Sequence, residues 1–157
     1  MLASIVCVIA AYLFGCISFA ILASSMFRLP DPRTYGSGNP GATNVLRSGK
    51  KAAALVTLLG DTAKGWVTVA LAERLAPTLG FGPTTIAACA LAVLLGHLYP
   101  VYFGFKGGKG VATALGVLLG LNVWLGLIAL GVFIVVVMLR RYVSLASICA
   151  ANAAAFV

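Results

Sequence analysis

Five long apolar stretches constrain the fold of this chain more than any other feature. They run from Leu2 to Phe27, Ala52 to Ala72, Thr84 to Phe105, Val111 to Leu139 and Tyr142 to Val157. Because a helix needs roughly 20 residues to cross a hydrocarbon core of about 30 Å, the first four are long enough to span a membrane. Only 9% of the residues are charged, whereas soluble domains have about 25%. We therefore expect an all-α polytopic membrane protein, with one domain over residues 1–157.

The expected architecture is a helical bundle of at least five membrane helices with short re-entrant or interfacial segments. The stretch from Val111 to Leu139 is longer than one crossing needs, so it must tilt, break or contain more than one short helix. The stretch from Tyr142 is short, and no interfacial charge or aromatic anchor follows Val157. We accordingly expect a C-terminal region of the protein to be missing from this sequence.

The basic residues predict which loops face the cytoplasm. If each of the first four stretches crosses once, one side of the membrane holds Arg28, Arg33, Arg47, Lys50, Lys51, Lys106 and Lys109. The other side holds Arg74, Arg140 and Arg141. The positive-inside rule then places the first group in the cytoplasm and the N-terminus outside, although an extra pass after Val111 would reverse the later assignments. A net charge of +8 on short loops suits anionic lipid headgroups or an anionic substrate, and nucleic acid is not an expected partner.

The longest polar loop concentrates groups that suit a phosphate. Its centre, residues 36–47, contains three glycines that permit unusual backbone geometry, together with hydroxyl and amide side chains and a bidentate cation. The candidate binding residues are Ser37, Asn39, Thr43, Asn44 and Arg47. A glycine-rich interfacial turn with helix caps is the simpler alternative.

A second glycine cluster lies directly before an expected helix. Lys109 is surrounded by Gly107, Gly108 and Gly110, so backbone N–H groups, a helix N-terminus and an ammonium could converge on one oxyanion. Lys106 and Lys109 could instead be anchors at the membrane surface, but an anchor does not need a flexible backbone.

Three ionisable residues and a glycine pair lie inside the expected spans. Asp61 and Lys64 are three residues apart, so they share a helix face and can neutralise each other, in a functional or a purely structural pair. His97, the only histidine, is a possible supporting residue. Gly116 and Gly120 form a G-x-x-x-G pattern, which predicts a close helix contact.

These motifs together resemble one family, the bacterial acyl-phosphate-dependent glycerol-3-phosphate acyltransferases (PlsY). The resemblance rests on residues 36–44 with Arg47, on 61–65, and on 96–100 running into 105–113. It implies a seven-helix enzyme of the bacterial cytoplasmic (inner) membrane that acts in phospholipid biosynthesis. The expected reaction transfers a fatty acyl group from a long-chain acyl phosphate to the 1-hydroxyl of glycerol 3-phosphate, giving lysophosphatidic acid and phosphate.

The resemblance also assigns residues. It implies that Ser37 and Arg47 are essential and that Gly107, Gly108, Lys109 and Gly110 form a phosphate-binding loop. A third family motif, with a histidine, an asparagine and a glutamate near the C-terminus, does not occur in this chain.

The residues favour catalysis by positioning, because acyl phosphate is already activated. Our hypothesis is that Lys109 and its glycines hold the phosphate of glycerol 3-phosphate, Arg47 pairs with a phosphate, and Ser37 orients one substrate. No metal or organic cofactor is required, and a substrate phosphate can accept the proton of the attacking hydroxyl. The alternatives are a covalent acyl-Ser37 intermediate, a small transporter or channel for anionic phosphorylated metabolites, and a structural membrane subunit.

Overall fold

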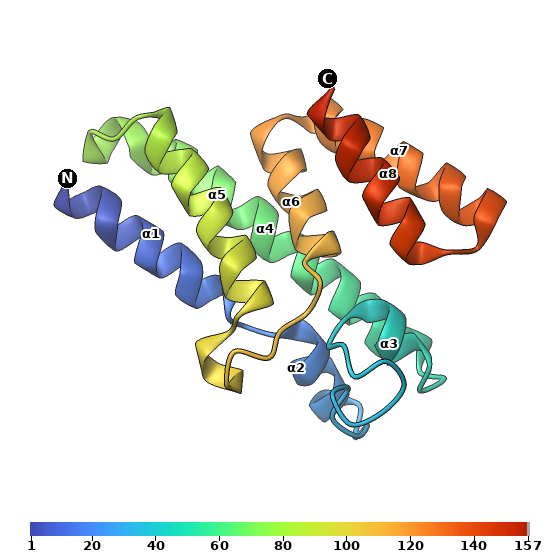
Figure 1. The fold of residues 1–157 in the computed structure, drawn as a ribbon. Coiled ribbons are helices and arrows are strands. Elements are labelled where there is room, and N and C mark those ends of the chain that lie inside the picture. The colour runs from blue at the N-terminus through green and yellow to red at the C-terminus, as the bar shows by residue number, and fades with distance from the viewer. Residues whose placement is uncertain (157) are drawn as a thin grey trace.

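A computed structural model describes residues 1–156, and all regular structure in that range is helical, as expected. The helices are α1 (Leu2–Gly15), α2 (Phe19–Met26), α3 (Ala42–Leu46), α4 (Lys51–Leu79), α5 (Pro83–Leu98), α6 (Val111–Leu121), α7 (Val123–Arg140) and α8 (Val143–Ala155), with a 3-10 turn η1 (Val101–Phe103) after α5. Figure 1 shows α2, α3 and the two polar loops gathered at one end of the bundle. The two loops singled out by the sequence therefore lie at the same end.

The first apolar stretch is a bent pair of helices rather than one continuous helix. α1 and α2 meet at an angle of 40°. The hydroxyl of Ser18 caps the new start by accepting a hydrogen bond from the backbone N–H of Ile21 at 3.4 Å. Such a break frees backbone carbonyls that need other partners inside a membrane. The carbonyl of Ile17 accepts a hydrogen bond from Nζ of Lys64, which belongs to the buried cluster described below.

The stretch from Val111 to Leu139 breaks at Asn122. The backbone is extended there (φ −159°, ψ 120°), and the side-chain oxygen caps α7 by accepting from the N–H groups of Trp124 and Leu125 at 2.9 and 3.3 Å. A methyl group placed on Gly126 would lie 2.8 Å from the backbone nitrogen of Leu119, so α7 folds back on α6 as a hairpin. The expectation that this stretch contains more than one helix is confirmed.

Helix length and hydropathy identify three candidate spans among the described residues. These are α4, α5 continued through η1, and α7, and the bent pair of α1 and α2 adds a fourth. α6 and α8 are shorter apolar helices. The all-helical membrane architecture is confirmed, with fewer full-length spans than the expected five.

Small residues allow the helices of the bundle to approach closely. α1 packs on α5, where Gly15 lies against the backbone of Val93 and Gly96 lies against the backbone carbonyl of Tyr12. α4 and α6 make a similar contact through Gly65 and Gly116, treated below. Inside a membrane, where lipid is as apolar as the side chains, such backbone approach is a main source of helix association.

The predicted contact of the glycine pair on α6 is confirmed. Gly116 lies against the carbonyl of Thr62, and Gly120 lies against the side chain of Val69, both on α4. Gly65 of α4 lies in turn against the carbonyl of Thr113 on α6. Because the contacts of Gly116 and Gly65 are made with backbone atoms, they fix where α6 begins. They thereby fix the position of residues 107–110, which we call the glycine loop.

Candidate functional site

Asn44 organises the first loop. Its side chain is 2% exposed, and its Oδ1 accepts from the backbone N–H of Ser37 at 2.9 Å. Its Nδ2 donates to the carbonyls of Pro32 and Tyr35 at 2.7 and 3.1 Å. Both hydrogens of the amide are thus used inside the loop. Asn44, predicted from sequence as a substrate-binding residue, thus holds the loop that carries Ser37.

The other predicted residues of the first loop lie nearer the surface. Ser37, Thr43 and Arg47 are exposed, and Asn39 is half-buried. Gly36 has a φ of 60° and lies so close to Asn44 Oδ1 that a side chain there would overlap it. The loop therefore needs glycine at this position, and it leaves the Ser37 hydroxyl and the Arg47 guanidinium accessible to a ligand.

In the second loop, which contains Gly107, Gly108, Lys109 and Gly110, two glycine N–H groups already donate backbone hydrogen bonds. Gly107 donates to the carbonyl of Leu98 and Gly108 to that of His97, both at 3.1 Å, which ties the loop to the end of α5. These two groups cannot also serve the anion nest expected from the sequence. The glycines here permit close packing instead, since a methyl group on Gly107 would overlap the same two carbonyls.

The start of α6 keeps its own donors free. Gly110 adopts a left-handed conformation (φ 77°) and no side chain caps the helix. Within residues 1–156, the backbone N–H groups of residues 109–112 have no hydrogen-bond acceptor. Together with the exposed ammonium of Lys109, they form an open cationic helix N-terminus that suits an anion.

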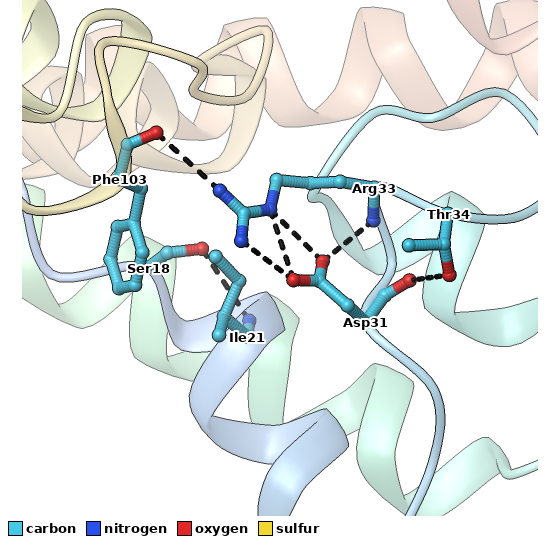
Figure 2. Close-up of polar contacts among 6 residues, drawn as sticks. All are labelled: Ser18, Ile21, Asp31, Arg33, Thr34 and Phe103. Atoms are coloured by element: carbon cyan, nitrogen blue, oxygen red, sulfur yellow. Dashed lines mark hydrogen bonds and ion pairs between the residues drawn. The ribbon is translucent and has the colours of Figure 1, made fainter.

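Arg33 joins the first loop to the second (Figure 2). It pairs with Asp31, to which Nη2 donates at 2.7 Å and Nε at 3.0 Å, and its Nη1 donates to the carbonyl of Phe103 at 3.4 Å. The guanidinium also lies 5.6 Å from the ring centroid of Phe103. Hydrogen bonds from Arg33 hold the pKa of the Asp31 carboxyl below its ordinary value, and the carboxylate raises the pKa of Arg33. We call Asp31, Arg33 and Phe103 the clasp.

The loops meet a second time at Gly108. A methyl group placed there would overlap Nε2 of His97 and lie 2.9 Å from the carbonyl oxygen of Pro40. Gly108 therefore lies between the first loop and the ring of His97. The structure gives no direct contact among Ser37, Arg47 and Lys109 within the described residues, so a bound ligand would have to connect them.

A buried polar cluster lies directly beneath this junction. Lys64 is 1% exposed, and its Nζ lies 2.8 Å from Asp61 Oδ1, 2.7 Å from the carbonyl oxygen of Ile17 and 2.9 Å from Nδ1 of His97. The hydroxyl of Thr113, at the start of α6, lies 3.3 Å from the same His97 nitrogen. The predicted pairing of Asp61 with Lys64 is confirmed, and the cluster links both halves of the bent first span to α4, α5 and α6.

Sequence reasoning missed the clasp, Pro40 and Thr113. Asp31 and Arg33 are two apart in a proline-flanked turn, so their pairing could have been predicted from local charge spacing. Their attachment to Phe103, 70 residues on, had no local signal. Within residues 1–156, no group of three or more His, Cys, Asp or Glu side chains could hold a metal ion.

Comparison with known proteins gives a consistent match. Residues 5–157 match the family described as glycerol-3-phosphate acyltransferase. The chain is 63% identical over 149 residues to the glycerol-3-phosphate acyltransferase of Nitrosospira multiformis, covering 95% of this chain and 74% of that protein. It is 60% identical over 143 residues to that of Chromobacterium violaceum, covering 91% of this chain and 69% of the relative.

Two solved structures have the same fold. One is a crystal structure of PlsY, an integral membrane glycerol 3-phosphate acyltransferase, in its glycerol 3-phosphate form. It is 40% identical with a TM-score of 0.88, covering 97% of this chain and 74% of that chain. The lysophosphatidic acid form is 39% identical with a TM-score of 0.86, over the same shares. The chain thus spans about three quarters of the length of both structures.

Proposed function

The chain belongs to the glycerol-3-phosphate acyltransferase family, and from this premise we propose how its two loops bind the substrates and direct the acyl transfer. It is an integral membrane enzyme that acylates glycerol 3-phosphate to lysophosphatidic acid. The family resemblance adds a long-chain acyl phosphate as donor, the 1-hydroxyl as acceptor, and the bacterial inner membrane as the location.

The phosphate of glycerol 3-phosphate binds at the start of α6 in this proposal. The observation that carries it is the set of unpaired N–H groups over residues 109–112, next to the exposed Lys109. A helix N-terminus favours an anion through its free N–H groups and its dipole, and an ammonium adds a full charge. Arg47 pairs with a phosphate of either substrate from the first loop, and Ser37 orients one substrate by hydrogen bonding.

The transfer itself is direct. The 1-hydroxyl oxygen attacks the acyl carbonyl carbon, the bond from that carbon to the phosphate oxygen breaks, and phosphate leaves. The hydroxyl proton passes to a phosphate oxygen, so no metal or organic cofactor is required. Positioning two anions and stabilising the developing charge are then the enzyme's main tasks.

The arrangement around Ser37 argues against a covalent acyl-serine. Within the described residues, the Ser37 hydroxyl has no hydrogen bond to a histidine or a carboxylate that could remove its proton. A serine hydroxyl is a weak nucleophile without such a base. The transporter alternative is also weaker, because Asp61, Lys64 and His97 are buried and paired with one another.

The helix hairpin changes the proposed sidedness. α7 folds back from the end of α6, so the turn between α7 and α8 lies nearer the start of α6 than its end (Figure 1). Arg140 ends α7 and Arg141 lies in this turn. Arg74 lies in the last two turns of α4, away from the helix start that follows the first loop. The positive-inside rule consequently favours cytoplasmic site loops and an external N-terminus more strongly than the original count.

The test is the substitution Lys109→Ala in the full chain, with Lys106→Ala as the matched control. Both remove one exposed cation from the same loop, but only Lys109 adjoins the free N–H groups. We expect the KM for glycerol 3-phosphate to rise about 10-fold or more for Lys109→Ala and to change little for Lys106→Ala. An unchanged KM for Lys109→Ala, or an equal rise for both variants, would refute the binding site.

A further inference from the structure

We propose that Lys64 fixes the tautomer of His97, and that the Nε2–H of His97 is a further hydrogen-bond donor to the substrate phosphate at the glycine loop. This inference rests on the proposed function of that loop, because it adds a donor to the same phosphate site. His97 becomes a binding residue, and Lys64 becomes a positioning residue that acts through it.

The first step is the set of partners around Lys64. An ammonium has three N–H donors and no acceptor. Its three polar neighbours are a carboxylate oxygen of Asp61, the carbonyl oxygen of Ile17 and Nδ1 of His97, all within 2.9 Å. The carboxylate of Asp61 favours the charged form, because its negative charge lies 2.8 Å from Nζ and balances that of the ammonium.

The second step concerns the histidine ring. Since an ammonium can only donate, Nδ1 of His97 accepts from Lys64 at 2.9 Å and carries no hydrogen, and the carboxylate oxygen of Asp61 lies farther from it, at 3.5 Å. The neutral ring then has its hydrogen on Nε2. Thr113 is compatible with this state, because its hydroxyl, 3.3 Å from Nδ1, can donate to the same nitrogen or to another acceptor.

The third step is where Nε2 lies. His97 is 7% exposed, and its Nε2 has no hydrogen-bond partner within residues 1–156. It lies against Gly108, so close that a methyl group on that residue would overlap it. Within residues 1–156, the fully buried polar side-chain atoms without a partner do not include Nε2, so part of its surface remains open to a ligand. Here it lies at the junction of the two site loops, next to the free N–H groups that begin at Lys109.

The glycine loop is built so that the ring can approach it. The N–H groups of Gly107 and Gly108 are bonded to the carbonyls of Leu98 and His97. Those bonds hold the loop over the end of α5 and remove two donors from the expected nest. The Nε2–H of His97, which lies against Gly108, supplies a donor in their place.

The ligand chemistry is a phosphate oxygen, which both substrates provide. Glycerol 3-phosphate is a phosphomonoester, and acyl phosphate carries a terminal phosphate on its anhydride. A neutral N–H donor bonded to an anionic oxygen contributes about 10- to 100-fold in affinity. The experiment below includes both substrates, so that it also tells which phosphate the donor meets.

The first experiment compares two substitutions of His97, each of which replaces one of the two ring nitrogens with a similar group. His97→Asn places an amide at the position of Nδ1, which keeps an acceptor for Lys64 and removes the donor. His97→Gln places an amide nitrogen as many bonds from the backbone as Nε2, which keeps the donor. Binding of glycerol 3-phosphate, acyl phosphate and inorganic phosphate is measured by calorimetry on the full chain in detergent. Thr68→Val, which removes a buried hydroxyl bonded only within α4, is the control.

We expect His97→Asn to weaken binding of one phosphate substrate about 10- to 100-fold. His97→Gln and Thr68→Val should each weaken binding of that substrate much less. Lys109→Ala is measured in parallel. If Lys109→Ala weakens binding and His97→Asn does not, the inference is wrong while the loop site stands. If neither variant weakens binding, the proposed phosphate site itself is wrong.

The second experiment reads the tautomer without relying on activity or on a variant's stability. Because this chain contains a single histidine, nitrogen-15 labelling of histidine gives one pair of ring signals by NMR. We expect an unprotonated Nδ1 and a protonated Nε2, with the Nε2–H signal shifting when glycerol 3-phosphate or inorganic phosphate is added. A proton on Nδ1 alone, or an Nε2–H signal that no phosphate ligand shifts, would overturn the proposal.

Discussion

Nη1 of Arg33 donates to the carbonyl oxygen of Phe103 at 3.4 Å, so one side chain spans the two loops of the site (Figure 2). The same guanidinium is held by Asp31 through hydrogen bonds of 2.7 to 3.1 Å. One loop presents Ser37 and Arg47, and the other presents Lys109. Transfer between two anionic substrates depends on the spacing of those groups, and the clasp is one of the two places where that spacing is set.

Breaking the clasp is expected to reduce catalysis more than it reduces stability. In Arg33→Ala both the link to Phe103 and the pairing with Asp31 are lost. Because the ion pair is about one-third exposed (32% for each side chain), it contributes little to the free energy of unfolding. We expect kcat/KM for glycerol 3-phosphate to fall about 3- to 10-fold, with a thermal midpoint close to that of the parent protein.

The control for this prediction is Lys51→Ala, which removes an exposed cation from the start of α4, shortly after the first loop in the sequence. Steady-state kinetics of both variants, with thermal unfolding followed in the same detergent, separate a lost link from a lost charge. An equal fall in kcat/KM for Lys51→Ala would show that net charge, and not the clasp, is responsible.

The clasp also predicts a dependence on pH. The hydrogen bonds from Arg33 lower the pKa of Asp31. A carboxyl whose pKa is lower in the folded protein stabilises it above the ordinary value of about 3.9. That stabilisation is lost as the pH falls through the lower folded value.

We therefore expect the first loop to loosen only below about pH 4. Amide hydrogen exchange over residues 31–38, measured from about pH 6 to about pH 3 and corrected for the intrinsic rate, would show it. Asp31→Asn should exchange faster already at neutral pH and lose the acid-dependent step. An acid-dependent step that persists in Asp31→Asn would assign it to another group.

Replacing Asn44 tests whether the first loop is folded by that one side chain. Asn44→Ala removes the partners of the Ser37 N–H and of the carbonyls of Pro32 and Tyr35. Buried polar groups left without partners cost about 1 to 3 kcal/mol each. Since water can enter a loop at the surface, we expect a loss of about 2 to 4 kcal/mol in the free energy of unfolding.

The matched control is Asn152→Ala on α8, where the amide is exposed and donates only to the carbonyl of Ile148 in its own helix. That variant should change the unfolding free energy by less than about 0.5 kcal/mol. Chemical denaturation of both variants gives the comparison. Similar losses in the two would mean that Asn44 does not organise the loop.

The parts of this molecule that local spacing encodes could be predicted from its sequence. Apolar run lengths gave the all-helical membrane architecture, and the three-residue spacing of Asp61 and Lys64 gave their ion pair. The spacing of Gly116 and Gly120 gave a close helix contact. The first depends on the length of an apolar run relative to the membrane thickness, and the other two depend on helix periodicity.

Contacts between segments far apart in the sequence could not be predicted. His97 joins Lys64 across 33 residues, and Arg33 reaches Phe103 across 70. The use of the Gly107 and Gly108 N–H groups by α5 also follows from packing and not from composition. Such contacts are fixed by how helices cross, which a single sequence does not state.

The crossing of α4 and α6 therefore gives a final prediction, because it sets where the glycine loop lies. A methyl group on Gly116 would overlap the carbonyl of Thr62 and lie 2.9 Å from the backbone nitrogen of Trp66. Backbone atoms cannot move aside as the end of a flexible side chain can. Gly116→Ala must then push α6 away from α4, and Thr113, at the start of α6, moves with it.

We expect Gly116→Ala to lower the free energy of unfolding by about 1 to 3 kcal/mol and to raise the KM for glycerol 3-phosphate. The control is Gly131→Ala on α7, where a methyl group would meet no atom within 4 Å. Alanine has the higher helix propensity, so that variant should be neutral or stabilised by up to about 1 kcal/mol. Denaturation and kinetics on both variants test the argument: if Gly116→Ala is as stable and active as Gly131→Ala, the contact between α4 and α6 does not position the loop.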